Sequence, residues 1–88
     1  MNTAFDLNLE HSYAEALRQQ HGAVDGQRFI TELEDRIGSV IHRLQQRHHV
    51  LPGVGDRLQV DADTVVTVIA RSFELEGKVW FSVQRYRA

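Results

Sequence analysis

The stretch HHVLPGVGDRL at residues 48–58 divides the chain into two halves of different character. Before it, apolar residues recur at three- and four-residue spacing, which is typical of amphipathic helices. After it, β-branched and aromatic residues dominate, which is typical of strands. Pro52, the only proline, pushes the residue before it out of the α region, and the glycines beside it let the chain turn. This stretch therefore predicts the end of a helix and the start of a strand.

The residues before this stretch predict one long amphipathic helix, with Asp25 as its N-cap and its end near His49. Its apolar stripe consists of Phe29, Ile30, Leu33, Ile37, Val40, Ile41 and Leu44. Acidic residues lie early in the helix and basic residues late, an order that complements the helix dipole. Gly38, inside the helix, costs about 1 kcal/mol against alanine and indicates close approach by a neighbouring element.

A shorter helix is predicted ahead of it, over residues 12–22. Ser12 is the expected N-cap, Glu15 completes a capping box, and Gly22 stands where a helix commonly ends. Still earlier, alternate residues of the stretch AFDLNLEH are apolar. That alternation leaves two readings open, a short strand or an arm that docks on the core.

Three strands are predicted in the second half, over residues 57–61, 64–75 and 78–87. The sequence thus predicts a single α+β domain over residues 1–88, mainly helical over 1–51 and a β-meander over 56–88. A short helix and a long amphipathic helix are followed by a three-stranded antiparallel β-meander. An added N-terminal strand remains an open alternative.

The turn between the last two strands allows two registers. A two-residue loop would pair Phe73 with Trp80, whereas a three-residue loop with Gly77 left-handed would pair Glu74 with Lys78. We prefer the second register because it makes a cross-strand ion pair. It places Ile69, Phe73, Val79, Phe81 and Val83 on the face that packs against the long helix.

The opposite face of the predicted sheet is half apolar, and one long helix cannot cover both faces. Either the N-terminal segment covers this second face, or another molecule does. Exposed apolar patches of this kind usually mark interaction sites. The predicted interaction surface consists of Val66, Val68, Trp80, Gln84 and Tyr86.

Composition limits the ways in which the chain is stabilised. A domain of 88 residues buries only about 60–65% of its unfolded surface, so it is marginal without further help. Cysteine is absent, which excludes disulfides and thiolate ligands and fits a reducing cytosol. No apolar run approaches the ~20 residues of a membrane span, and no secretory signal opens the chain. We therefore expect a cytoplasmic homodimer without membrane contact.

No pattern predicts a metal site, a cofactor or a catalytic residue. Histidines stand at positions 11, 21, 42, 48 and 49, but the position four after His42, where a helical zinc site has its second ligand, is Gln46. The serines lack any nucleophile elbow. A small dimeric enzyme is therefore ranked third among the functional hypotheses. It is kept because a dimer interface can form a cleft.

Residues 51–55, LPGVG, resemble the hairpin of the helix-hairpin-helix DNA-binding family, and a predicted helix precedes them. The resemblance implies that backbone amides contact phosphate, and it points to an anion or nucleic-acid site at Gly53, Gly55 and Arg57. It covers five residues of 88. Gln59 replaces a small residue of the family, and the residues after it lack the stripe of a second helix.

These observations rank three functions. The leading hypothesis is a non-enzymatic, homodimeric protein-interaction module. The second is a nucleic-acid-binding accessory protein that uses the LPGVG turn or stacks bases on Trp80 and Tyr86. A formal charge of −2 provides no global basic footprint for that role.

Overall fold

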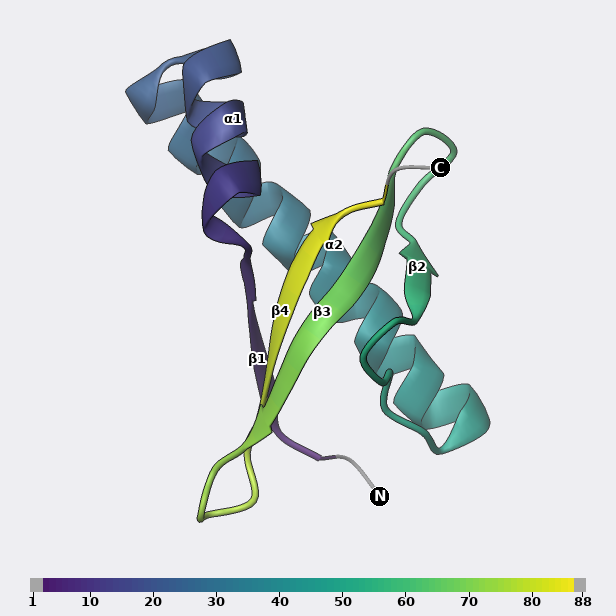
Figure 1. Ribbon diagram of the computed structural model, residues 1–88. Helices are drawn as coiled ribbons and strands as arrows, with labels where there is room; N and C mark the ends of the chain where they lie inside the picture. Colours follow the sequence, from purple (N-terminus) through teal and green to yellow (C-terminus); the bar gives the residue numbers. More distant parts are fainter. Residues whose placement is uncertain (1–2, 87–88) are drawn as a thin grey trace.

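In the computed structural model, which describes residues 3–86, two helices pack on a four-stranded mixed sheet (Figure 1). The elements in chain order are β1 (Phe5–Leu9), α1 (His11–His21), α2 (Ala23–His48), β2 (Arg57–Gln59), β3 (Val65–Phe73) and β4 (Val79–Arg85). Strands β2, β3 and β4 form the predicted antiparallel meander. The N-terminal segment is a strand, and it joins the edge of the sheet parallel to β4, so the sheet order is β1-β4-β3-β2.

Helix α2 buries the stripe that its sequence predicts. Its buried members are Ile30, Leu33, Ile37 and Ile41, while Phe29, Val40 and Leu44 are half-buried at the margins. The helix begins at Ala23, ahead of the predicted N-cap Asp25, because the chain turns out of α1 at Gly22 with a φ of 88°. It ends at His48, where His49 adopts the left-handed conformation and donates its backbone N–H to the Gln45 carbonyl.

Helix α1 begins at His11, one residue earlier than predicted, because Glu10 rather than Ser12 is its N-cap. The Glu10 carboxylate accepts the backbone N–H groups of Ser12 at 3.0 Å and Tyr13 at 3.4 Å. The Ser12 hydroxyl also donates to Glu10, and these hydrogen bonds lower the pKa of Glu10. A carboxylate satisfies orphan helix donors as well as a hydroxyl does, and it also suits the positive end of the helix.

The two helices meet at a glycine that sequence reasoning passed over. A Cβ atom built on Gly26 would lie 2.7 Å from the Cα atom of Arg18 in α1, closer than real Cβ atoms approach a backbone. At Gly38 a Cβ atom would make only ordinary contacts, 3.8 Å from Leu7 and 3.9 Å from Phe5. The predicted close approach at Gly38 is therefore wrong, and the tight contact lies at Gly26.

The hairpin between β3 and β4 has the predicted three-residue loop. The backbone N–H of Glu74 donates to the Lys78 carbonyl at 2.8 Å, and Gly77 has a φ of 91°. The predicted ion pair between those two side chains is wrong, since Lys78 pairs with Asp6 of β1 and Glu74 accepts the indole N–H of Trp80. The backbone register was therefore correct, although the side-chain argument for it was not.

A β-bulge in β3 overturns part of the predicted face assignment. Val68 lies opposite Val83, but Ala70 lies opposite Ser82, so one residue of β3 is left unpaired between them. One extra residue moves every side chain on its far side to the other face. The part of β3 before the bulge therefore has its faces exchanged relative to the prediction.

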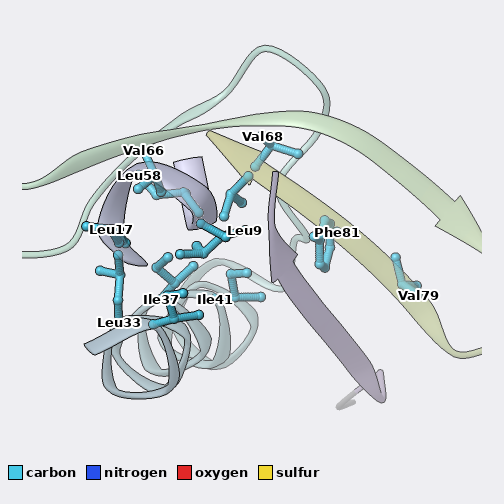
Figure 2. Packing of buried hydrophobic residues seen from close by; sticks show 13 residues of the cluster. Leu9, Leu17, Leu33, Ile37, Ile41, Leu58, Val66, Val68, Val79 and Phe81 are labelled. Atoms are coloured by element: carbon cyan, nitrogen blue, oxygen red, sulfur yellow. The ribbon is translucent and has the colours of Figure 1, made fainter. Parts of the chain in front are cut away.

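Four residues of β3 differ from their predicted burial. Val66 and Val68, predicted on the outer face, are completely buried in the core with Leu17, Leu58 and Phe81 (Figure 2). Ile69, predicted in the core, is 37% exposed because it stands at the bulge. Phe73, also predicted in the core, keeps its place opposite Val79 but is 66% exposed, since it lies at the end of the hairpin that projects past the helices (Figure 1).

Candidate functional site

Both helices lie on the same side of the sheet, so residues 3–86 leave its other face open (Figure 1). We call this side the open face. The strand pairings place the following residues on it: Asp6, Asn8, Arg57, Gln59, Val65, Thr67, Ala70, Ser72, Trp80, Ser82 and Gln84. Most of these side chains are small or polar, and Trp80 is the one large ring among them. Of the predicted interaction surface, Trp80 and Gln84 lie here, whereas Val66 and Val68 do not.

Exposed apolar residues gather on the β3–β4 hairpin. Of the seven large hydrophobic side chains exposed in the described part of the chain, the hairpin carries Ile69, Phe73, Leu75 and Trp80. Leu75, at the tip, is fully exposed. Single exposed apolar residues are ordinary on protein surfaces, but a group of them on one projecting element is a feature of interaction sites.

Trp80 is held in place by its neighbours on the open face. Its indole N–H donates to Glu74, and the Lys78 ammonium lies 5.2 Å from the ring centroid. Lys78 is fixed in turn by Asp6, 2.7 Å away, and that hydrogen bond raises the pKa of Lys78. The ring is therefore a rigid surface feature with a cation close to its face.

Tyr86, the last member of the predicted surface, is also engaged within the chain. The Arg57 guanidinium donates to the Tyr86 hydroxyl at 2.9 Å and lies 4.9 Å from the ring centroid. A base that stacks on an aromatic ring needs the ring face to itself. With Lys78 at Trp80 and Arg57 at Tyr86, both rings proposed for base stacking already carry a cation of their own.

The turn that resembles a DNA-binding hairpin uses its amides internally. The Gly53 N–H donates to the Asp56 carboxylate at 2.7 Å, and the Gly55 N–H donates to the Val68 carbonyl at 2.8 Å. Strand β2 follows, where the helix-hairpin-helix family has a second helix. In this conformation Asp56 stands where a phosphate would bind, and Arg57 is directed to Tyr86. The structure does not assemble these residues into an anion site.

A groove of about 570 Å³ runs between strand β1 and helix α2. Its floor is formed by Phe5, Leu7 and Gly38, and its helical wall carries Glu34, Asp35, Ser39, His42, Arg43 and Gln46. Burial raises the pKa of Glu34, although the carboxylate accepts the backbone N–H of Leu9. Sequence reasoning missed this groove, and a glycine within a strongly amphipathic helix was the only signal that pointed to it.

A second groove, of about 530 Å³, lies between the helices and the ends of the strands. The His21 ring stacks on Phe29 with 4.7 Å between centroids. Burial raises the pKa of Tyr13, while the nearby Arg85 and Arg36 act in the opposite direction. The groove carries aromatic and charged side chains, and its polar residues come from α1, α2, β4 and the segments that flank β3 and β4.

The described residues assemble no recognised catalytic or metal-binding unit. An activated nucleophile needs a base within hydrogen-bond reach, and the Ser12 hydroxyl meets a carboxylate only as part of the exposed helix cap. Across residues 3–86, no group of three or more His, Asp or Glu side chains is placed to hold a metal ion. Neither described helix is long and apolar enough to cross a membrane.

Comparisons with protein-family models, curated proteins and solved structures found no match. The surfaces of residues 3–86 are therefore the features that indicate a function.

Proposed function

We propose that this chain is a homodimeric protein-interaction module that offers its open face and the adjoining hairpin to a protein partner. One observation carries the proposal. Four of the seven exposed large hydrophobic side chains of residues 3–86 lie on the β3–β4 hairpin, where Trp80 is on the open face and Phe73 is on the opposite side of the sheet, beyond the helices.

The character of the open face supports a protein partner. Interfaces favour rigid aromatic residues surrounded by small or polar side chains, because a fixed ring loses little conformational entropy on binding. Trp80 is such a ring, and its hydrogen bond to Glu74 and its contact with Lys78 hold it before any partner arrives. Small neighbours such as Ala70 and Ser82 leave the surface around it flat.

Two observations favour this function over the alternatives. Nucleic-acid binding through the LPGVG turn would require amides that are already bonded to Asp56 and to the Val68 carbonyl. Nucleophilic catalysis by a hydroxyl would require a base beside it, and no serine, threonine or tyrosine hydroxyl bonds to a histidine in the described residues.

Two measurements test the proposal. Sedimentation velocity over a range of protein concentrations is expected to show a dimer. A photoreactive residue at Gln84, on the open face, is expected to give one saturable cross-link to a partner protein in the native cells. The same residue at Thr31, on the exposed side of α2, serves as the matched control. Trp80→Ala should abolish the cross-link from position 84.

A chain that remains monomeric at all concentrations, or a cross-link that is the same from both positions and indifferent to Trp80→Ala, would contradict the proposal.

A further inference from the structure

Strand β1 is an edge of the sheet, and half of its backbone groups face away from β4. The Glu10 N–H donates to the Val83 carbonyl, and the Ala4 carbonyl accepts the Val79 N–H. Alternate residues point to opposite sides of a strand. The backbone groups of Thr3, Phe5, Leu7 and Leu9 therefore face the groove beside α2.

Helix α2 satisfies the two ends of this free edge with side chains. The Gln45 amide accepts the Thr3 N–H at 2.7 Å and donates to the Thr3 carbonyl at 3.2 Å, as a neighbouring strand would do. At the other end Glu34 accepts the Leu9 N–H at 3.3 Å. Between them, the N–H and C=O groups of Phe5 and Leu7 have no partner within residues 3–86. Exposed edges of this kind are templates for pairing with another strand.

The wall of the groove carries opposite charges at its two ends. Glu34 and Asp35 lie toward the start of α2, whereas the positive charge toward its end comes from Arg43, with the polar His42 ring beside it. The midpoint of both pairs falls between Gly38 and Ser39, two small residues. A surface with this order of charges is complementary to itself when it is turned by half a turn about that midpoint.

We propose that a second copy of this chain docks antiparallel along the groove, about a twofold axis that passes near Gly38 and Ser39. This inference depends on the proposed homodimer and specifies its interface. Glu34 of each copy meets Arg43 of the other, and Asp35 meets His42. The small residues at the axis let the second copy approach without a steric block.

The backbone completes the same interface. Gly38 lies beside both Phe5 and Leu7, so the axis that passes near Gly38 also passes near the middle of β1. Antiparallel pairing then joins Phe5 of each copy to Leu7 of the other, and it uses the backbone groups that α2 leaves free. The two four-stranded sheets become one continuous sheet. Both open faces remain on the same side of it, available to partners.

The pairing has one unfavourable contact, which makes the inference specific. Asp6 points to the open face, and at the axis it meets Asp6 of the second copy. Like charges directly opposite on neighbouring strands are destabilising, and the ion pair with Lys78 only partly offsets this. Asp6→Asn is therefore expected to strengthen the dimer, whereas Glu76→Gln in the exposed hairpin loop is expected to leave it unchanged.

Charge reversal is the main test. Arg43→Glu is expected to raise the dimer dissociation constant at least about tenfold at low salt, because a carboxylate then faces Glu34 of the second copy. The double variant Glu34→Lys/Arg43→Glu is expected to restore much of the lost affinity. Arg28→Glu, on an exposed part of the same helix, is the matched control and should leave dimerisation unchanged. Sedimentation velocity measures the dimer dissociation constant of each of the three variants.

Gly38→Leu tests the groove without changing charge. Its side chain fills the space that the second copy would occupy, so the dimer is expected to be lost while the melting transition remains cooperative. This variant also covers the case in which a charge-reversed chain fails to fold.

The outcomes separate the two proposals. A dimer that persists equally in Arg43→Glu and Gly38→Leu overturns the groove interface while leaving the homodimer intact. If Trp80→Ala dissociates that dimer, the open face is the self-association surface instead. A wild-type chain that is monomeric at every concentration overturns both proposals.

Discussion

Gly26 and Gly38 lie on the same helix but in opposite situations. Gly26 is buried against α1, where any Cβ atom would clash with the Arg18 backbone. Gly38 borders an open groove, where a Cβ atom would meet Leu7 and Phe5 at ordinary distances. Both weaken the isolated helix by a similar amount. The comparison shows that one glycine is required by the packing of this chain, and the other leaves space that this chain does not fill.

Gly26→Ala is expected to cause the largest loss of folding free energy. The added methyl group meets backbone rather than a flexible side chain, so α1 and α2 must move apart. Overpacking of this kind costs about 1–3 kcal/mol, more than the helix propensity of alanine restores. Urea denaturation measures the loss of folding free energy. A variant as stable as the wild type would show that the helix crossing adapts at little cost.

Gln45→Ala is expected to cause the second-largest loss of folding free energy. The buried amide makes two hydrogen bonds to the backbone of Thr3, and its loss leaves the polar groups at that end of β1 unpaired. We expect a loss of about 1–3 kcal/mol, measured by the same denaturation. In protein dilute enough to be monomeric, Gln46→Ala, at the exposed neighbouring position, is the control and should change stability little. Equal effects at the two positions would contradict the role assigned to Gln45.

Gly38→Ala is expected to act in the opposite direction from Gly26→Ala. The new methyl group finds room and improves helix propensity, so the monomer should gain about 0.8–1.0 kcal/mol. The measurement is made at protein concentrations below the dimer dissociation constant, which isolates the effect within one chain. A loss of stability in the monomer would mean that the groove is tighter than its contact distances indicate.

Glu34→Gln is expected to change the folding free energy least of the four substitutions. The size of that change should depend on pH. Burial raises the pKa of Glu34 above its usual 4.5, so the folded state holds the proton more tightly than the unfolded state. The stabilisation from Glu34 is then fully present below the unfolded pKa and is lost as the pH rises through the folded pKa. Glutamine keeps an oxygen to accept the Leu9 N–H.

The check is the difference in folding free energy between wild type and Glu34→Gln, followed across the acidic range in dilute protein. The wild type is expected to lose stability relative to the variant as the pH rises. The opposite slope would show that the hydrogen bond to Leu9 dominates over burial in the monomer.

Much of the fold was predictable because it depends on local patterns. The stripe from Phe29 to Leu44 has helical period and is the side of α2 that packs in the core. Gly77 is left-handed, as a three-residue hairpin loop requires. The first helix cap was misplaced because Glu10 and Ser12 are both acceptable caps, and only the direction of the chain as it leaves β1 selects Glu10.

The candidate surfaces were less predictable because one residue decided them. The bulge beside Ile69 moved Val66 and Val68 into the core. No glycine and no break in the alternation of apolar residues near Ile69 predicted this bulge. The groove beside β1 was missed for a different reason, since the parallel pairing of β1 with β4 joins opposite ends of the chain. Trp80 and Gln84 were placed correctly because they lie on β4, which has no bulge.

The sequence by itself determined the helices, the meander and the hairpin loop, because periodicity and turn chemistry act over a few neighbouring residues. Only the tertiary structure decided which side of β3 is buried, which glycine of α2 is indispensable and which strand edge stays free. Those features depend on contacts between residues far apart in the chain, such as Gly26 with Arg18 and Thr3 with Gln45. The free edge of β1 and the open face around Trp80 are products of that packing.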